Sequence, residues 1–203
     1  MYRQYLTYLG VDPQQISTIQ DVPFLPISVF KNQVVMTGRW TPEVFYTSSG
    51  TTGQTPSRIY LDKDTARRQS RALARIMTHV LGPRRLPMLI VDSRGLLQDR
   101  RAFSARGAGV LGMMTFGAQP TWVLDDNMQL DRAALDGFLA RHGGRPFLIF
   151  GFTFMVWAYF HGALAGAGVD LSNGTLIHSG GWKQLAERAV DNATFKAALR
   201  AST

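Results

Sequence analysis

Residues 121–150 read TWVLDDNMQLDRAALDGFLARHGGRPFLIF and contain a strand, a helix and a second strand. The strands are the short apolar runs at residues 121–124 and 147–150. Between them, residues 131–142 have the pattern of a helix that Asp131 can cap and Gly143-Gly144 can end. Two buried strands joined through a helix form a βαβ unit, in which the strands run parallel. This stretch therefore predicts a parallel sheet covered by helices.

The same alternation continues on both sides of this stretch. Helices are predicted over residues 63–81, 103–114, 153–165 and 184–199, and strands over residues 88–91 and 175–178. Asp62 or Asp64 can cap the first of these helices. We expect an α/β fold with a mainly parallel sheet flanked by helices, in a single incomplete domain over residues 1–203. Its core would occupy residues 46–203 and a lead-in segment residues 1–45, where prolines at 23 and 26 favour an extended course for residues 21–31.

Residues 46–58 read YTSSGTTGQTPSR and lie between two further predicted strands, at residues 44–46 and 59–61. The backbone N–H groups and hydroxyls of such a loop suit a polyphosphate, and its glycines allow the backbone to approach an anion. It is not a Walker loop, because no Lys-Ser/Thr pair follows its second glycine. A solvated linker is the alternative for this composition; the position between two strands favours phosphate binding. The candidate binding residues are Ser48, Ser49, Gly50, Thr51, Thr52 and Gly53.

Three other loops follow predicted strands, at residues 92–95, 151–153 and 179–183. Ligands of open parallel sheets bind beyond the carboxyl ends of the strands, so we expect these loops to share one edge of the sheet. The Gly180-Gly181 pair either contacts a ligand there or makes the tight strand-to-helix turn that any α/β protein needs. The spacing leaves both interpretations open.

The composition excludes several kinds of function. The 203 residues include no cysteine, which excludes disulfides, thiolate metal sites and a thiol nucleophile in this chain and fits a cytoplasmic protein. The formal net charge of +8 comes mostly from dispersed arginines, which indicate a solvated basic surface rather than a nucleic-acid-binding stripe. No apolar run approaches the ~20 residues of a membrane span, and no secretory signal is visible.

The Ser/Thr/Gly loop also carries a resemblance. Residues 47–53, TSSGTTG, resemble the phosphate-binding loop of the adenylate-forming superfamily, in the form found in phenylacetate-CoA ligases and acyl-protein synthetases. Residues 21–31 and the SGGWK turn at residues 179–183 are similar to segments of long-chain-fatty-acid–luciferin-component ligases, the acyl-protein synthetases of bacterial bioluminescence. Over residues 2–190 the chain resembles the N-terminal half of such an enzyme.

This resemblance implies ATP-dependent activation of a fatty acid to an acyl-adenylate, followed by acyl transfer to a thiol. It implies ATP and Mg²⁺ as cofactors, with the loop on the β- and γ-phosphates and with Thr51 and Thr52 as its main side-chain contacts. The residues expected against the adenine or the acyl-adenylate are Gly180, Gly181 and Trp182. The residues expected in an acyl pocket are Phe150, Gly151 and Phe152. For the neighbouring Met155 and Trp157, a place in the core is the favoured alternative. No residue is assigned to catalysis or to a metal.

The sequence also departs from the resemblance. The lysine that follows the loop in many relatives is absent, and Arg58 is the nearest cation. The C-terminal motifs and the catalytic lysine of the superfamily are not in this chain, and neither is the acyl-accepting cysteine of acyl-protein synthetases. The alternatives are therefore a catalytically incomplete nucleotide- or acyl-binding module that acts with a partner chain and, less favoured, a basic nucleic-acid-binding domain. An acyl-accepting protein or a reductase is the expected kind of partner.

Overall fold

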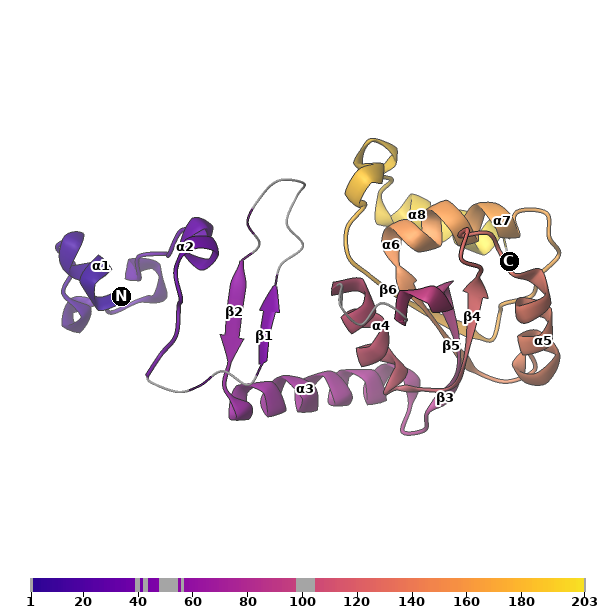
Figure 1. Ribbon diagram of the computed structural model, residues 1–203, viewed down its shortest axis with the longest axis horizontal. Coiled ribbons are helices and arrows are strands. Elements are labelled where there is room, and N and C mark those ends of the chain that lie inside the picture. The colour runs from indigo at the N-terminus through magenta and orange to yellow at the C-terminus, as the bar shows by residue number, and fades with distance from the viewer. Residues whose placement is uncertain are drawn as a thin grey trace. The chain divides into compact units, whose positions relative to one another are not determined.

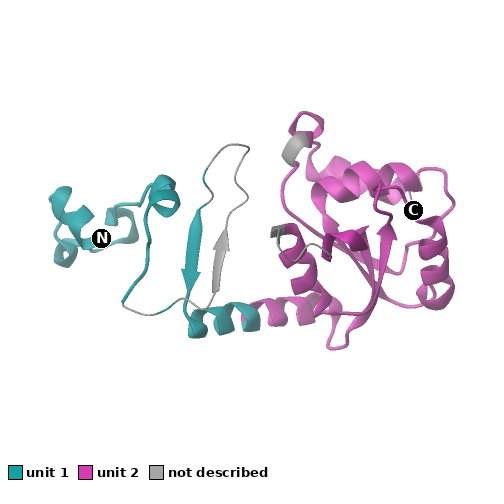
Figure 2. Ribbon diagram, viewed as in Figure 1, with its two compact units in different colours: residues 1–71 teal, residues 72–203 magenta. Residues whose placement is uncertain are grey.

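The computed structural model describes residues 2–38, 41, 44–47, 55, 57–97 and 105–202, with the backbone alone at residues 44–47, 105, 183 and 184. These residues form two compact units, residues 1–71 and residues 72–203 (Figure 2). The expectation of one domain with a lead-in over residues 1–45 stays a prediction.

The first unit contains short helices, then a hairpin, and ends within helix α3 (Lys63–Leu81). The helices are α1 (Tyr2–Tyr8), η1 (Pro13–Gln15), η2 (Ile19–Asp21) and α2 (Ile27–Asn32). The extended course predicted for residues 21–31 is wrong over its second half, which is helix α2. Pro26 occupies the N-cap position with φ −57°, and a proline fits the start of a helix because no N–H is required of it there.

Strands β1 (Val44–Thr47) and β2 (Arg58–Leu61) confirm the two strands predicted on either side of the Ser/Thr/Gly loop, and they pair as an antiparallel hairpin. Thr47 pairs with Arg58 at one end of the hairpin, and Val44 pairs with Leu61 at the other. The loop therefore connects the Thr47–Arg58 end, and the chain leaves for the next helix from the Leu61 end.

Helix α3 (Lys63–Leu81) has the predicted bounds. Asp62 is the residue that caps it, because its Oδ1 accepts a hydrogen bond from the Thr65 N–H at 2.6 Å. Gly82 ends it with a φ of +80°, a conformation that favours glycine. Apolar side chains of α3 are largely exposed, since Ile76 and Val80 are 60% and 53% accessible.

The second unit contains a four-stranded sheet in which every neighbouring pair is parallel (Figure 1). Its strands are β3 (Leu86–Ser93), β4 (Gly117–Leu124), β5 (Phe147–Phe152) and β6 (Gly174–Ser179), in the order β4-β3-β5-β6. This confirms the α/β fold and the parallel sheet. The chain moves outward from β3 to β4 and then crosses to the other side of β3 to form β5 and β6. The strand order therefore reverses between β3 and β5.

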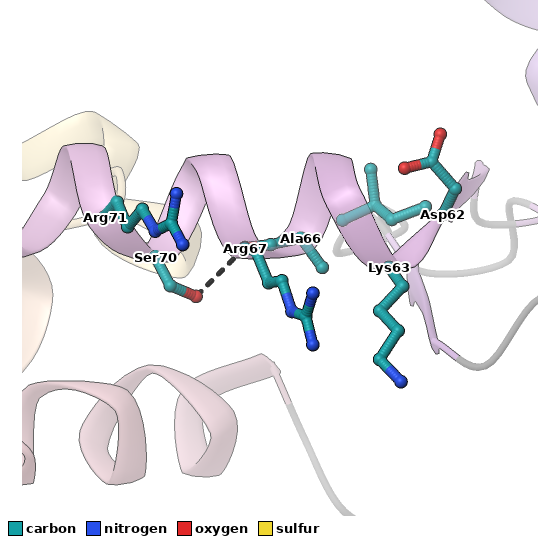
Figure 3. Close-up of a pocket in the computed structure, with 7 residues that line it drawn as sticks. Asp62, Lys63, Ala66, Arg67, Ser70 and Arg71 are labelled. Atoms are coloured by element: carbon teal, nitrogen blue, oxygen red, sulfur yellow. Dashed lines mark hydrogen bonds between the residues drawn. The ribbon is translucent and has the colours of Figure 1, made fainter.

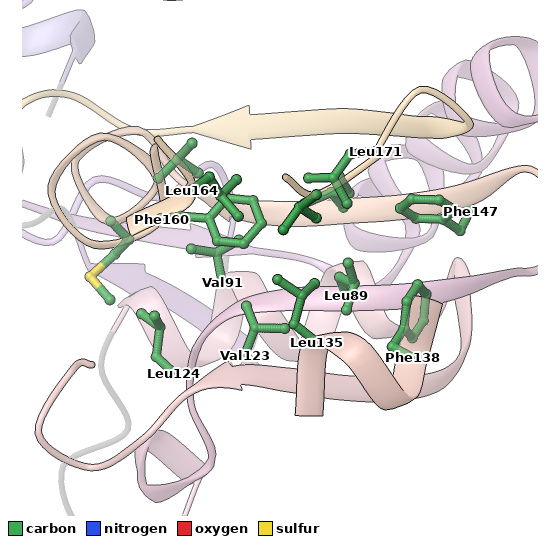
Figure 4. Close-up of a cluster of buried hydrophobic side chains, with 14 of the residues drawn as sticks. Leu89, Val91, Val123, Leu124, Leu135, Phe138, Phe147, Phe160, Leu164 and Leu171 are labelled. Carbon is green, nitrogen blue, oxygen red and sulfur yellow. The ribbon is translucent and has the colours of Figure 1, made fainter. Parts of the chain in front are cut away.

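Helices cover both faces of this sheet because the side chains of each strand alternate between the faces. On one face, Leu89 and Val91 of β3 join residues of α5 (Arg132–His142) and of the helical segment that follows β5 in a buried cluster (Figure 4). On the other face, Met88 and Ile90 pack with Val110 of α4 (Ala105–Met114). The sheet is thus the middle layer of the unit.

Two helical predictions are corrected in detail. The predicted helix at residues 153–165 consists of α6 (Thr153–Met155), a π-helical segment η4 (Val156–His161) and α7 (Gly162–Leu164). The single helix predicted at residues 184–199 is wrong, because the chain forms a 3₁₀ helix η5 (Lys183–Arg188) and a separate helix α8 (Asn192–Ser202). Ala189 is extended, and Asp191 starts α8 by accepting a hydrogen bond from the Thr194 N–H at 2.7 Å.

Candidate functional site at the carboxyl edge of the sheet

Two of the three predicted edge loops are joined at the carboxyl end of the parallel sheet. Phe152, at the end of β5, pairs in register with Ser179, at the end of β6. The hydroxyl of Thr153 lies 2.8 Å from the carbonyl oxygen of Gly180 and 3.2 Å from that of Ser179. Thr153 is buried, whereas Ser179 and Gly180 are exposed, so these contacts lie at the margin of the core. The loops at residues 151–153 and 179–183 therefore meet, as the topology predicted.

His178 extends the same hydrogen-bond network. Its Nδ1 lies 2.9 Å from the Thr153 hydroxyl oxygen. A hydroxyl has one proton to donate, and carbonyl oxygens only accept. If Thr153 donates to Gly180, Nδ1 of His178 must be the protonated nitrogen and must donate to Thr153, which leaves Nε2 as an acceptor. Burial lowers the pKa of His178 below its usual value, and the charge of Lys196 lowers it further, so the neutral ring is favoured.

Of the two interpretations of the glycine pair after β6, the structure shows the tight turn. Gly180 has a φ of +81°, and a Cβ added there would lie 3.0 Å from the Phe152 ring, so Gly180 makes the tight turn. Gly181 has no heavy atom within 4 Å of an added Cβ, so space is open beside it. Trp182 is half-buried and packs edge-on against Trp157, with ring centroids 5.5 Å apart. Contact of Gly181 and Trp182 with a ligand stays a prediction.

The residues predicted for an acyl pocket are mostly enclosed. Phe150 is 2% exposed and belongs to the core cluster beside α4. A Cβ on Gly151 would lie 2.8 Å from side-chain atoms of both Val91 and Val156. Phe152 is half-buried and is the one of the three with appreciable open surface. Among their neighbours, Met155 is part of the core, as favoured above, and Trp157 packs against it.

Sequence reasoning missed a buried ion pair at the end of β3. Asp92 is 1% exposed, and its Oδ2 lies 3.2 Å from Nε of Arg106 on α4. Within the described residues this Oδ2 has no hydrogen-bond partner, so the guanidinium is close to it but not aligned for a hydrogen bond. Burial raises the pKa of Asp92, and Arg106 opposes that rise. The available signal was an aspartate directly after an apolar strand at a predicted ligand edge.

The third predicted edge loop is held by a hydrogen-bond chain next to this ion pair. The hydroxyl of Ser93 donates to Asp126, which follows β4, and accepts a hydrogen bond from the Gly95 N–H at 3.0 Å. Residues 92–95 are thereby fixed between the ends of β3 and β4. Hydrogen bonds therefore connect the strand ends at two places on the carboxyl edge, one between β3 and β4 and the other between β5 and β6.

The predicted phosphate loop, Ser48, Ser49, Gly50, Thr51, Thr52 and Gly53, lies outside the described residues. Arg58, which could supply the missing charge, is the first residue of β2 and is exposed next to the point where the loop joins the hairpin. Binding of phosphate by this loop stays a prediction.

A shallow basic hollow of about 390 Å³ lies in the first unit, where β2 meets α3 (Figure 3). Lys63 and Arg67 extend from the same side of α3, one helical turn apart. This hollow is at the Leu61 end of the hairpin and therefore at the opposite end from the Ser/Thr/Gly loop. Its walls come from one helix and one strand end, so few groups converge on it.

A second cavity, of about 410 Å³, lies in the second unit along the edge strand β6. It is lined by side chains of β6 and α8 and has a mainly apolar floor. His178 belongs to its wall, so the cavity extends from the carboxyl edge along the strand. Residues 174–200 contribute most of this lining, which sequence reasoning did not identify as a site.

The part of the chain that the structure describes contains no helix long and apolar enough to cross a membrane. In comparisons with known proteins, a model of the family described as "Acyl-protein synthetase, LuxE" matches residues 1–202. No curated protein and no solved structure matches the chain.

Proposed function

The chain belongs to the LuxE acyl-protein synthetase family, and on that premise we propose that it takes part in ATP-dependent activation of a fatty acid and transfer of the acyl group to a thiol. The family match over residues 1–202 is the observation that carries this proposal. The parallel sheet supports it, because its carboxyl edge, where strand order reverses, is the place where open α/β sheets bind ligands.

The chemistry proceeds in two steps. In the first, a carboxylate oxygen attacks the α-phosphorus of ATP, the bond to the β-phosphate bridging oxygen breaks, and pyrophosphate leaves. In the second, a thiolate attacks the acyl carbonyl carbon and AMP leaves, which produces a thioester. Because this chain has no cysteine, the thiol belongs to another molecule or segment, such as an acyl-accepting partner protein.

The residues of this chain would hold the reactants and orient them. In the proposal, residues 48–53 bind the pyrophosphate part of ATP by backbone N–H groups and hydroxyls. The open space at Gly181 and the face of Trp182 accommodate the flat adenine or the acyl-adenylate. Thr153 keeps the 151–153 and 179–183 loops together, so this surface is formed before the ligand binds.

In the proposal, Mg²⁺ enters bound to ATP. The described residues contain no group of three His, Asp or Glu side chains able to hold a metal ion by themselves. A Mg²⁺ that enters with ATP needs no such group, because phosphate oxygens and waters provide most of its ligands. The ion would offset the charge of the phosphates when bound.

The first half-reaction is testable by exchange of radioactive pyrophosphate into ATP in the presence of fatty acids. We expect exchange with the full-length protein and its loss in Gly50→Val, because a branched side chain would block the approach of phosphate to the backbone. Gly112→Ala is the control, since it adds a methyl group with no heavy atom within 4 Å. Absence of exchange with a broad panel of carboxylic acids would contradict activation, and normal exchange in Gly50→Val would contradict the role of the loop.

A further inference from the structure

The groove along β6 has the size and shape of a small-molecule site. Its volume of about 410 Å³ lies within the range of ~300–1,000 Å³ typical of ligand pockets. One wall comes from β6, the edge strand of the sheet, and the other from α8, which packs on η4. The two walls of the groove therefore belong to packed secondary-structure elements.

The floor of this groove is hydrocarbon. It is lined by the apolar residues Ile149, Phe160, Leu171, Leu176, Phe195 and Leu199. Four of them belong to the buried core cluster, and Figure 4 shows Phe160 and Leu171 within it. Leu176 and Leu199 are half-buried and pack against that cluster, so a ligand would cover them at little cost in rearrangement.

The rim of the groove is cationic. Lys196 and Arg200 both line it, lie one turn apart on α8 and are exposed. None of the ion pairs found among the described residues involves either of them. Like charges four residues apart on a helix repel each other. A carboxylate placed between the two would relieve this repulsion and form charge-assisted hydrogen bonds.

We propose that the groove between β6 and α8 is the acyl-binding site, with an aliphatic chain along the apolar floor and its carboxylate between Lys196 and Arg200. This assignment rests on the proposed function and locates its acid substrate. His178 connects the groove to the carboxyl edge, because it lines the groove and also contacts Thr153. By contrast, Phe150, expected in an acyl pocket, does not line this groove and packs in the core cluster beside α4.

Direct binding without nucleotide tests the assignment. Isothermal titration calorimetry of the full chain compares decanoate with butyrate, which has the carboxylate but a short chain, and with 1-decanol, which has the chain but no charge. Decanoate should bind at least about tenfold more tightly than either, because each lacks one of the two complementary features. Equal binding of decanoate and 1-decanol would overturn the role of the two cations.

Substitutions that reverse the charge of the two rim cations test whether decanoate binds in the groove. Lys196→Glu and Arg200→Glu should each weaken decanoate binding by about tenfold or more, since a hydrogen bond to a charged group is worth about that factor. Arg141→Glu is the matched control: Arg141 is an exposed arginine in the last turn of α5, as Arg200 is in α8, but it does not line the groove. Unchanged binding in both reversals, or an equal loss in the control, overturns the proposal.

Binding and exchange measured on the same variants distinguish a failure of the groove assignment from a failure of the proposed function. If decanoate binding depends on its chain, its carboxylate and the two rim cations but no acid supports pyrophosphate exchange, the groove assignment stands and the activation proposal fails. If exchange occurs and both reversals leave the KM for the acid unchanged, the activation proposal stands and the groove assignment fails.

Discussion

Thr153 is the residue that joins the two strand ends of the candidate site. It is the first residue after β5, and its single hydroxyl lies within hydrogen-bond distance of His178 and of two carbonyl oxygens after β6. Removing this buried hydroxyl is costly, because its own hydrogen bonds to these partners are lost. Thr153 therefore affects both local stability and the protonation of His178.

Thr153→Val keeps the shape of the side chain and removes only the hydroxyl. We expect it to destabilise the protein by about 1–2 kcal/mol and to abolish the preference of His178 for a proton on Nδ1. Chemical denaturation measures the first effect, and ¹⁵N NMR of the imidazole ring measures the second. Thr153→Ser is the control and should retain both properties. An unchanged tautomer in Thr153→Val would show that the hydroxyl does not orient the ring.

At the scale of elements, α5 is the clearest case of a helix whose start is encoded locally. Asp131 accepts a hydrogen bond from the Ala134 N–H at 2.9 Å and precedes the first residue of the helix. The helix also buries Leu135 and Phe138 against the sheet, so its start affects the core. A local signal and tertiary packing agree here, which explains why the predicted bounds differ from the observed ones only in the capping residue.

Asp131→Ala should destabilise the second unit by about 1 kcal/mol, because the N-terminal N–H of Ala134 loses its partner. Asp131→Asn keeps an acceptor oxygen and should retain most of the stability. Urea denaturation followed by tryptophan fluorescence compares the two. If Ala and Asn at this position were equally stable, the cap would contribute nothing and packing alone would hold the helix.

At the scale of the whole molecule, the buried Asp92–Arg106 pair connects the sheet to α4 and makes stability depend on pH. The pKa of Asp92 is raised from its ordinary value of 3.8, chiefly by burial. A raised pKa means that the folded state holds this proton more tightly than the unfolded state does. The contribution of Asp92 to stability is therefore fully present below pH 3.8 and is lost as the pH rises through the folded-state pKa.

Arg106→Leu should enlarge this effect, because it leaves the carboxylate buried without a counter-charge. We expect a loss of about 1–3 kcal/mol at pH 7, which allows for the partial exposure of the arginine. The loss should shrink as the pH falls toward 3.8 and Asp92 takes up a proton. Urea denaturation across this pH range is the measurement.

Arg132→Leu is the control for that series. Arg132 pairs with Asp136 at 2.7 Å, but both side chains are about half exposed, so their pair contributes little. Its removal should change stability only slightly and nearly equally at every pH above 5. A penalty for Arg106→Leu that did not vary with pH would show that Asp92 is not the titrating partner.

The pattern of the sequence was sufficient to predict the alternation of strands and helices and the parallel sheet. Short apolar runs between capped helices are compatible with few other folds, since each strand must bury both of its faces. The bounds of α3 and the meeting of residues 151–153 with 179–183 followed from the same reasoning. Prediction failed at residues 184–199, where local capping by Asp191 divided a continuous helical pattern.

Sequence by itself determined the fold class, the family resemblance and the edge of the sheet at which ligands are expected, because these depend on residue order and periodicity. Only the tertiary structure decided that Phe150 is enclosed, that Asp92 is paired with Arg106, and that β6 and α8 form a groove with two cations at its rim. These features bring together residues far apart in the chain or on separate elements. Their burial and spacing arise when the layers pack, and no local pattern encodes them.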